Sequence, residues 1–180
     1  MRLILKKAGI SIFLLLLAAT GVRAQNPTYL CELRNDHQVD ARTFDFDVYL
    51  LRTGTVAFEL TNMQFGININ AGARNGGNIT VSLVSGTSGL KAIQIPTENK
   101  LTFTTAKNSI NMTAKLGPGV GEGTIISNVG FGTRVGTIRI TNTANFGTVR
   151  PNLIWGWAIP KVNVITKVSA YDCVATEITV

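Results

Sequence analysis

Two tryptophans near the end of the chain are the clearest candidates for ligand recognition. Trp155 and Trp157 are two residues apart, so on a strand their side chains project from the same face. If that face were exposed, the two rings would form a flat platform on which sugar rings could stack. Leu153 and Ile159 share the face, however, and a row of Leu, Trp, Trp and Ile suits a buried sheet interior. We favour the buried interior and keep a glycan-binding platform as the alternative.

Two aspartates and the single histidine are the candidates for acid–base chemistry. Asp45 and Asp47 share one strand face about 7 Å apart, a spacing that paired acids or a bound cation would need. A charged outer face that discourages edge aggregation is the favoured interpretation. His37 follows Asp36, which would orient a general base, but a solvated turn residue is favoured there too. We therefore predict no catalytic residues, no metal site and no cofactor, and the chain is not expected to be an enzyme.

A glycine-rich stretch, Gly117–Gly123, has the composition of a phosphate-binding loop. Such a loop needs a closing Lys-Ser/Thr and a following helix, and neither is present. The stretch is predicted to be a mobile hairpin loop.

The two cysteines, Cys31 and Cys173, lie near the two ends of the chain. An even cysteine count in an exported protein favours a disulfide, and bridging them would tie the first segment to the last. Two buried free thiols are the alternative. The cysteines are too far apart in sequence for a zinc motif, which needs closely spaced pairs.

Residues 1–24 have the three parts of a secretory signal peptide. Arg2, Lys6 and Lys7 precede a short apolar run, and Val22-Arg23-Ala24 places compact residues at the −3 and −1 positions of a cut between Ala24 and Gln25. The run is shorter than the ~20 residues that a membrane span needs. The mature product is therefore expected to be secreted or attached to the cell surface, with no transmembrane segment.

The remaining chain is rich in β-branched residues. From Gln25 onward, 49 of 156 residues are Val, Ile or Thr, which fit a pleated surface better than a helix. Phe44, Phe46, Val48 and Leu50 alternate with polar residues, and similar short runs follow between Gly, Asn and Pro turns. The pattern predicts an all-β fold, a two-sheet antiparallel β-sandwich of about 8–9 strands. The expected organisation is a signal peptide (1–24), a lead segment (25–38) and a β-sandwich domain (39–180).

The net charge of +7 belongs partly to the signal peptide. Removing its four basic residues leaves about +3 on the mature product. Later basic positions such as Arg134, Arg139 and Arg150 lack interleaved aromatic residues, so nucleic acid is not an expected partner. A solvated outer face explains them.

Several motifs resemble a domain common in exported Bacteroidetes proteins. The first half of the resemblance rests on Phe46-Asp47-Val48-Tyr49-Leu50, Gln64-Phe65-Gly66-Ile67 and Asn75-Gly76-Gly77. The second half rests on the run from Gly132 to Asn142 and on Asn152-Leu153-Ile154-Trp155. The resemblance covers roughly Val39 to Trp157. It implies a sandwich similar to cohesin and carbohydrate-binding modules, in proteins that often end in a type IX secretion sorting domain. This chain has no Pro-Asn-Pro sorting segment after Val180, so it is expected to be a fragment of a longer protein or to travel by another route.

The leading functional hypothesis is a non-catalytic secreted or surface-associated module for adhesion, spacing or partner binding, with a glycan or another surface protein as its partner. A carbohydrate-binding module that uses Trp155 and Trp157 is the second hypothesis. A small secreted hydrolase using Asp45 and Asp47 is the third and least favoured.

Overall fold

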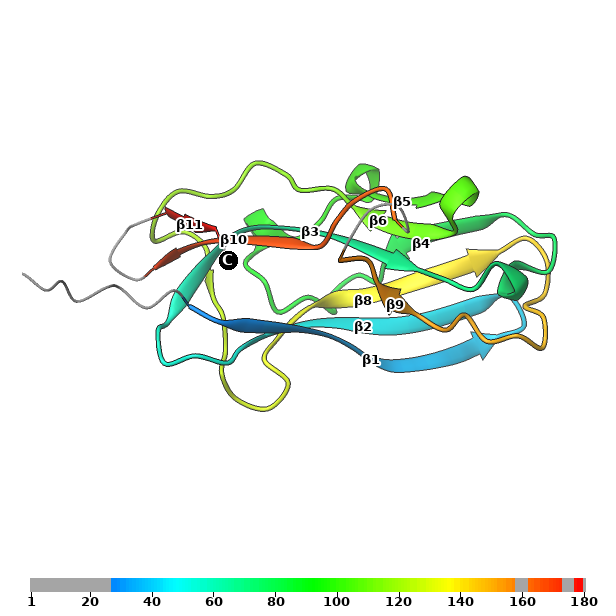
Figure 1. Ribbon diagram of the computed structural model, residues 1–180, viewed down its shortest axis with the longest axis horizontal. Coiled ribbons are helices and arrows are strands. Elements are labelled where there is room, and N and C mark those ends of the chain that lie inside the picture. Colours follow the sequence, from blue (N-terminus) through cyan, green and yellow to red (C-terminus); the bar gives the residue numbers. More distant parts are fainter. Residues whose placement is uncertain (1–26, 158–161, 173–176, 180) are drawn as a thin grey trace, which may run out of the picture.

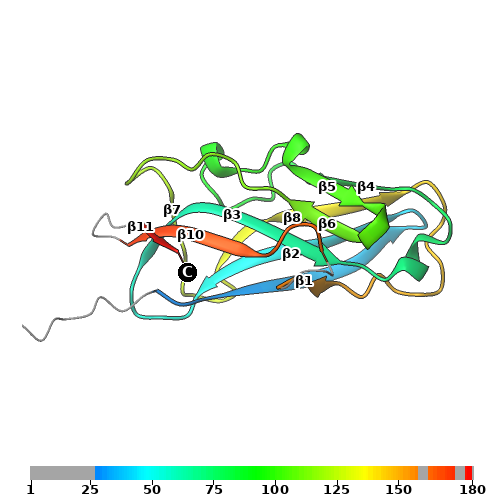
Figure 2. The same ribbon diagram turned by 45° about the horizontal axis from the view of Figure 1, so that its top comes forward.

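The computed structural model describes residues 27–157, 162–172 and 177–179. Two antiparallel sheets face each other, as Figures 1 and 2 show from two directions. The all-β sandwich prediction is confirmed, with eleven strands in the described residues instead of eight or nine. The strands are β1 (Tyr29–Asp40), β2 (Thr43–Arg52), β3 (Phe58–Asn68), β4 (Ile79–Leu83), β5 (Leu101–Thr104), β6 (Ser109–Met112), β7 (Thr124–Ile125), β8 (Thr133–Asn142), β9 (Ile154–Trp155), β10 (Lys167–Asp172) and β11 (Glu177–Thr179). Four single-turn 3₁₀ helices connect them: η1 (Ala71–Arg74), η2 (Ala92–Gln94), η3 (Glu98–Lys100) and η4 (Thr105–Lys107).

The first sheet has the strand order β1-β2-β8-β4. The second sheet has the order β11-β10-β3-β6-β5, and β7 and β9 also pair with β3. All registers are antiparallel; Phe46 of β2 lies opposite Ile138 of β8, and Phe58 of β3 lies opposite Asp172 of β10. Strand β1 is therefore an edge of the first sheet, and its long free side borders the candidate site described below.

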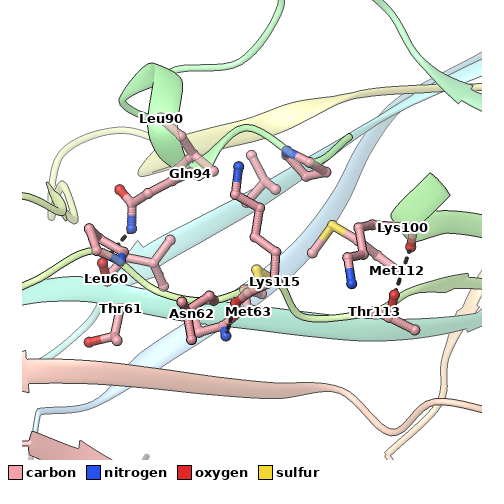
Figure 3. A pocket seen from close by; sticks show the side chains of 14 residues that line it. Leu60, Thr61, Asn62, Met63, Leu90, Gln94, Lys100, Met112, Thr113 and Lys115 are labelled. Carbon is pink, nitrogen blue, oxygen red and sulfur yellow. Dashed lines mark hydrogen bonds between the residues drawn. The ribbon is translucent and has the colours of Figure 1, made fainter. Parts of the chain in front are cut away.

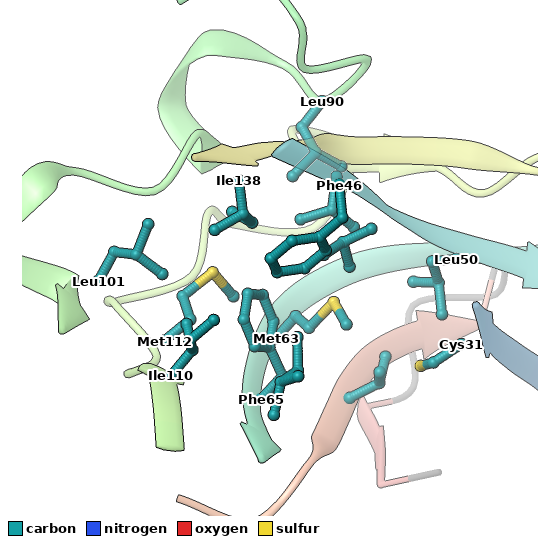
Figure 4. Packing of buried hydrophobic residues seen from close by; sticks show 14 of the residues in the cluster. Cys31, Phe46, Leu50, Met63, Phe65, Leu90, Leu101, Ile110, Met112 and Ile138 are labelled. Atoms are coloured by element: carbon teal, nitrogen blue, oxygen red, sulfur yellow. The ribbon is translucent and has the colours of Figure 1, made fainter. Parts of the chain in front are cut away.

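The hydrophobic core lies between the inner faces of the two sheets (Figure 4). The alternating residues of β2 supply one side of it: Phe46, Val48 and Leu50 are fully buried. Phe65 and Ile67 of β3 lie on the other side and are equally buried. Burying each such side chain contributes about 1.5–3 kcal/mol relative to leaving it in water.

Strand β1 begins well before the expected start of the sandwich at Val39. Residues 29–40 pair with β2 over most of the segment expected to be only a lead into it. Two register shifts, between Arg34 and His37 and between Gln38 and Asp40, bend the second half of the strand. Asn35 adopts a positive φ of 53° within the first shift. These irregularities interrupt the free edge, which is how natural sheets discourage pairing with other chains.

Residues 162–166, which lead into β10, cross the outer face of the second sheet. The Val164 amide donates to the Asn111 side chain at 3.3 Å, and Asn163 donates to Thr104 at 2.7 Å. Gly66 of β3 lies under this connection: a Cβ at Gly66 would come within 1.9 Å of the Val164 carbonyl oxygen. The close passage of two backbones therefore requires glycine here.

None of the helices in the described part of the chain has the length and apolar character that a membrane crossing requires.

Candidate functional site

A groove of about 780 Å³ lies beside the second half of β1. One wall is formed by β1 residues from Leu33 to Gln38, and the other by the segment 146–153 that leads from β8 to β9. Figure 1 shows this segment passing the end of β1 on its way to β9. The volume falls in the range of ~300–1,000 Å³ typical of ligand sites.

The groove has an apolar floor and a polar rim. Phe44 is buried in the floor, and Phe146 packs against it edge to face, with 6.3 Å between ring centroids. Asp36, His37 and Arg150 are exposed on the rim. This distribution lets apolar contacts supply binding energy while a few polar groups fix the orientation of a ligand.

Backbone hydrogen bonds fix both ends of the 146–153 wall. The Phe146 amide donates to the Ala41 carbonyl at 2.8 Å, and the Asn70 amide donates to the Pro151 carbonyl at 2.6 Å. The wall is thereby tied to the β1–β2 turn at one end and to the loop after β3 at the other. These hydrogen bonds hold the 146–153 wall in position, so the groove is already formed in the folded protein.

The two tryptophans follow the groove wall directly. Leu153 lines the groove, and Trp155 forms β9, where it lies opposite the core residue Ile67 of β3. Trp155 is half-buried and contacts Phe65 edge to face, with ring centroids 6.0 Å apart. Trp157 packs against Trp155, with 5.9 Å between centroids and 39° between ring planes, and remains 55% exposed.

Each of the two interpretations of the tryptophan pair, a buried sheet interior and an exposed platform, therefore fits one of the two residues. Trp155 packs against the core, as does Leu153, which is the environment expected for a sheet interior. Trp157 is exposed beside it, which is the environment that a stacking platform needs. Ile159, the fourth member of the row, lies outside the described residues.

The aspartate pair lies on the outer face of the first sheet and is engaged by basic and polar partners. Asp45 accepts two hydrogen bonds from Arg139, at 2.9 Å from Nε and 2.8 Å from Nη2. These bonds raise the pKa of Arg139. Asp47 accepts from Asn35 at 2.7 Å and from Thr137.

Because both oxygens of each carboxylate already accept hydrogen bonds and the side chains are buried, the pair faces no open site for acid–base chemistry.

His37 lies in the bent part of β1, with its Nδ1 2.8 Å from the Asn35 carbonyl oxygen. Among the described residues, no group of three or more His, Cys, Asp or Glu side chains is arranged to hold a metal ion.

A buried glutamate that sequence reasoning missed holds the glycine-rich loop. Glu59 of β3 is buried, and its Oε2 accepts from the Gly121 amide at 2.9 Å while its Oε1 accepts from the Gly123 amide. The segment predicted to be a mobile loop is therefore anchored at two of its amides. The feature of the sequence that could have indicated this role is an acidic residue flanked by Phe58 and Leu60 in an apolar strand.

Cys31 is buried in the core next to the inner face of β2 (Figure 4). Burial raises the pKa of its thiol to about 12. Its predicted disulfide partner, Cys173, lies outside the described residues, so the bridge stays a prediction.

A second cavity lies between β3 and the loop that carries η2 (Figure 3). Gln94 crosses it and donates to the Leu60 carbonyl, while its side-chain oxygen accepts from Thr124 at 2.7 Å. The space is only about 20 Å³, which holds about one water molecule. It has no room for an organic ligand.

Comparisons with known proteins add two structural likenesses. No protein-family model and no curated protein matches the sequence. A chain of a type II Cohesin–X-Dockerin complex from Acetivibrio cellulolyticus aligns with a TM-score of 0.41 and 6% identity, over 86% of this chain and 92% of the other. An endoglucanase from Clostridium thermocellum, solved with cellotetraose, aligns with a TM-score of 0.39 and 10% identity, over 89% of this chain but 27% of the other. At these scores, the assignment of function depends on the residues of this chain.

Proposed function

We propose that the chain is a non-catalytic binding module of an exported protein, and that its ligand is a glycan chain. The observation that carries this proposal is Trp157, whose exposed ring is supported from behind by Trp155. An aromatic ring packed against Trp155, which itself packs on the core, loses less conformational freedom on binding than a free ring, and this favours affinity.

The groove supplies the rest of the binding surface. Trp157 follows Leu153, the last residue of the groove wall, by four residues, about 13 Å along an extended chain. A glycan chain stacked on Trp157 would continue toward the polar rim at Arg150 and His37. Those side chains offer the donors and acceptors that sugar hydroxyls need.

Native affinity electrophoresis against soluble β-glucan, xyloglucan, mannan and xylan, with pull-down on cellulose and chitin, tests the proposal. At least one glycan should retard the wild-type protein. Trp157→Ala should weaken that binding about tenfold or more, as removal of a central aromatic contact does, and should leave the melting temperature nearly unchanged because the side chain is exposed.

Two further variants complete the design. Trp155→Ala should lose binding and also stability, since Trp155 packs on Phe65. Ile93→Ala removes an equally exposed apolar side chain elsewhere, 53% exposed, and should bind as the wild type does. The proposal is wrong if no glycan retards the folded protein, or if Trp157→Ala binds normally.

Export is the second part of the proposal. It is supported by the signal-peptide pattern of residues 1–24. Expression of the full chain in a Gram-negative host, followed by N-terminal sequencing of the exported product, should give a first residue of Gln25. An uncleaved cytoplasmic product would contradict export.

A further inference from the structure

We propose that the outer face of the first sheet binds an acidic, extended polypeptide segment of a partner protein. The surface concerned, here called the arginine face, consists of Arg34, Tyr49, Phe131, Arg134 and Arg139. It lies on the opposite side of the first sheet from the core and does not depend on the glycan groove.

On this face, the arginine side chains are more exposed than the aspartates with which they pair. The Arg134 and Arg139 side chains are 38% and 40% exposed, whereas their partners Asp47 and Asp45 are 7% and 8% exposed. These two carboxylates therefore lie beneath the guanidinium groups of Arg134 and Arg139, which are the more exposed members of each pair. Arg34 is paired near the surface with Glu32, 2.7 Å away. Complementary charge on the partner fixes register and accelerates association.

Arg134 retains most of its donors for a ligand. Its Nη1 is 3.7 Å from Asp47, a separation too long for a hydrogen bond. Arg139 uses Nε and Nη2 for Asp45. Its Nη1 makes no hydrogen bond to another described residue, and the Asp40 carboxylate also acts on this guanidinium through its charge. Both guanidinium groups can donate hydrogen bonds to the carboxylate of a partner without breaking a hydrogen bond within the protein.

The spacing of the arginines matches an extended chain. Arg134 lies opposite Tyr49 of β2, and Arg139 lies opposite Asp45. Those β2 positions are four residues apart, about 13 Å along a strand. Carboxylates at positions i and i+4 of an extended peptide have the same separation and project from the same face.

An aromatic contact beside the arginines favours a polypeptide over an acidic polysaccharide. Phe131 is 50% exposed, with the Arg34 guanidinium 3.8 Å from its ring centroid and Tyr49 edge-on at 5.9 Å. The turn after Phe131 requires glycine at position 132, where φ is +87° and a Cβ would come within 2.3 Å of the Leu50 carbonyl oxygen. An exposed Phe packed against half-buried Tyr and Arg side chains has the composition of a protein-interface hot spot.

Fluorescence anisotropy with labelled synthetic peptides tests the proposal on the full mature chain. The first peptide alternates Thr with Glu and carries one central Phe. The second has the same composition with all glutamates clustered at one end, and the third replaces Glu by Gln. Polygalacturonate serves as a competitor that carries carboxylates on a polysaccharide.

The alternating acidic peptide should bind, and binding should weaken as salt is raised. Arg134→Gln and Phe131→Ala should each weaken it about tenfold, whereas Lys167→Gln, which removes an exposed charge from the second sheet, should leave it unchanged. Arg134 has no short hydrogen bond to lose, so its replacement should leave the fold intact, as a thermal melt would verify.

Several results would overturn the proposal: no binding of the alternating peptide, equally tight binding of the clustered or Gln peptide, tighter binding of polygalacturonate, or insensitivity to both variants. None of these results would count against glycan binding through Trp157, because the two sites share no residue.

Discussion

Replacing Glu59 by Gln is expected to destabilise the sandwich although the two side chains have nearly the same volume. Glu59 is buried on β3, and its two oxygens accept the amides of Gly121 and Gly123. A Gln side chain keeps one acceptor oxygen and turns an NH₂ group toward the other amide. One of the two amides then has no acceptor in the protein, and the remaining hydrogen bond loses its charged partner.

The size of the effect follows from these two losses. A hydrogen bond to a charged group contributes about 1.5–3 kcal/mol, and an unsatisfied buried donor costs about 1–3 kcal/mol. Because one bond survives in neutral form, the free energy of unfolding should fall by about 2–4 kcal/mol. In a domain of this size that corresponds to a melting temperature lower by roughly 4–16 °C.

Urea unfolding followed by tryptophan fluorescence measures the change, and hydrogen exchange at the Gly121 and Gly123 amides locates it. Glu98→Gln, which changes an exposed glutamate at the start of η3, is the matched control and should be nearly neutral. If Glu59→Gln were as stable as the wild type and both amides stayed protected, the carboxylate could not be what holds the loop.

Three further changes probe the cysteines and the crossing connection. In natively exported protein, a Cys31–Cys173 disulfide should make the intact mass two hydrogens lower than after reduction, and reductant should lower the melting temperature; two readily alkylated thiols would contradict the bridge. In the reduced protein, burial raises the pKa of Cys31 from 9.0 to about 12, so the unfolded thiol ionises first and stability should decline between pH 9 and 12, by up to about 1.4 kcal/mol per pH unit; an unchanged decline in Cys31→Ala would refute this. Gly66→Ala should cost about 3 kcal/mol, because its Cβ would collide with the Val164 carbonyl, whereas Gly119→Ala, whose nearest neighbour is 3.5 Å away, should be tolerated; equal melting temperatures would argue against the close crossing.

The sequence pattern predicts this fold best where a strand has neighbours on both sides. Phe46, Val48 and Leu50 alternate with polar residues and are fully buried, as period-two alternation implies. Strand β1 escaped prediction because an edge strand needs few apolar residues: Cys31 is buried and Leu33 half-buried, while the residues from Asn35 onward are exposed.

The candidate sites depend on contacts that periodicity does not encode. The run after Trp157 alternates as a strand does, yet Val162 is buried on the outer face of β3, and the glycine at position 66 was the only local sign of that crossing. The groove joins β1 to a segment more than a hundred positions later in the chain, so no local pattern indicates it. Glu59 lies between the core residues Phe58 and Leu60, and its carboxylate is bound by the amides of the glycine-rich loop, a contact that the strand pattern does not encode.

The pairing of early strands with late ones determines when the molecule can assemble. Strand β2 pairs with β1 on one side, but its other partner, β8, begins only at Thr133. Strand β3 pairs along most of its length with β10, which begins only at Lys167. Such long-range pairings make folding slow, on the order of milliseconds to seconds. For a chain that emerges from its N-terminus first, the first sheet is incomplete until β8 has appeared and the second sheet until β10 and β11 have appeared. The apolar faces of the early strands stay uncovered until then. A chain cut before Lys167 would leave one side of β3 open along most of its length, and such a fragment is prone to associate with other copies instead of folding alone.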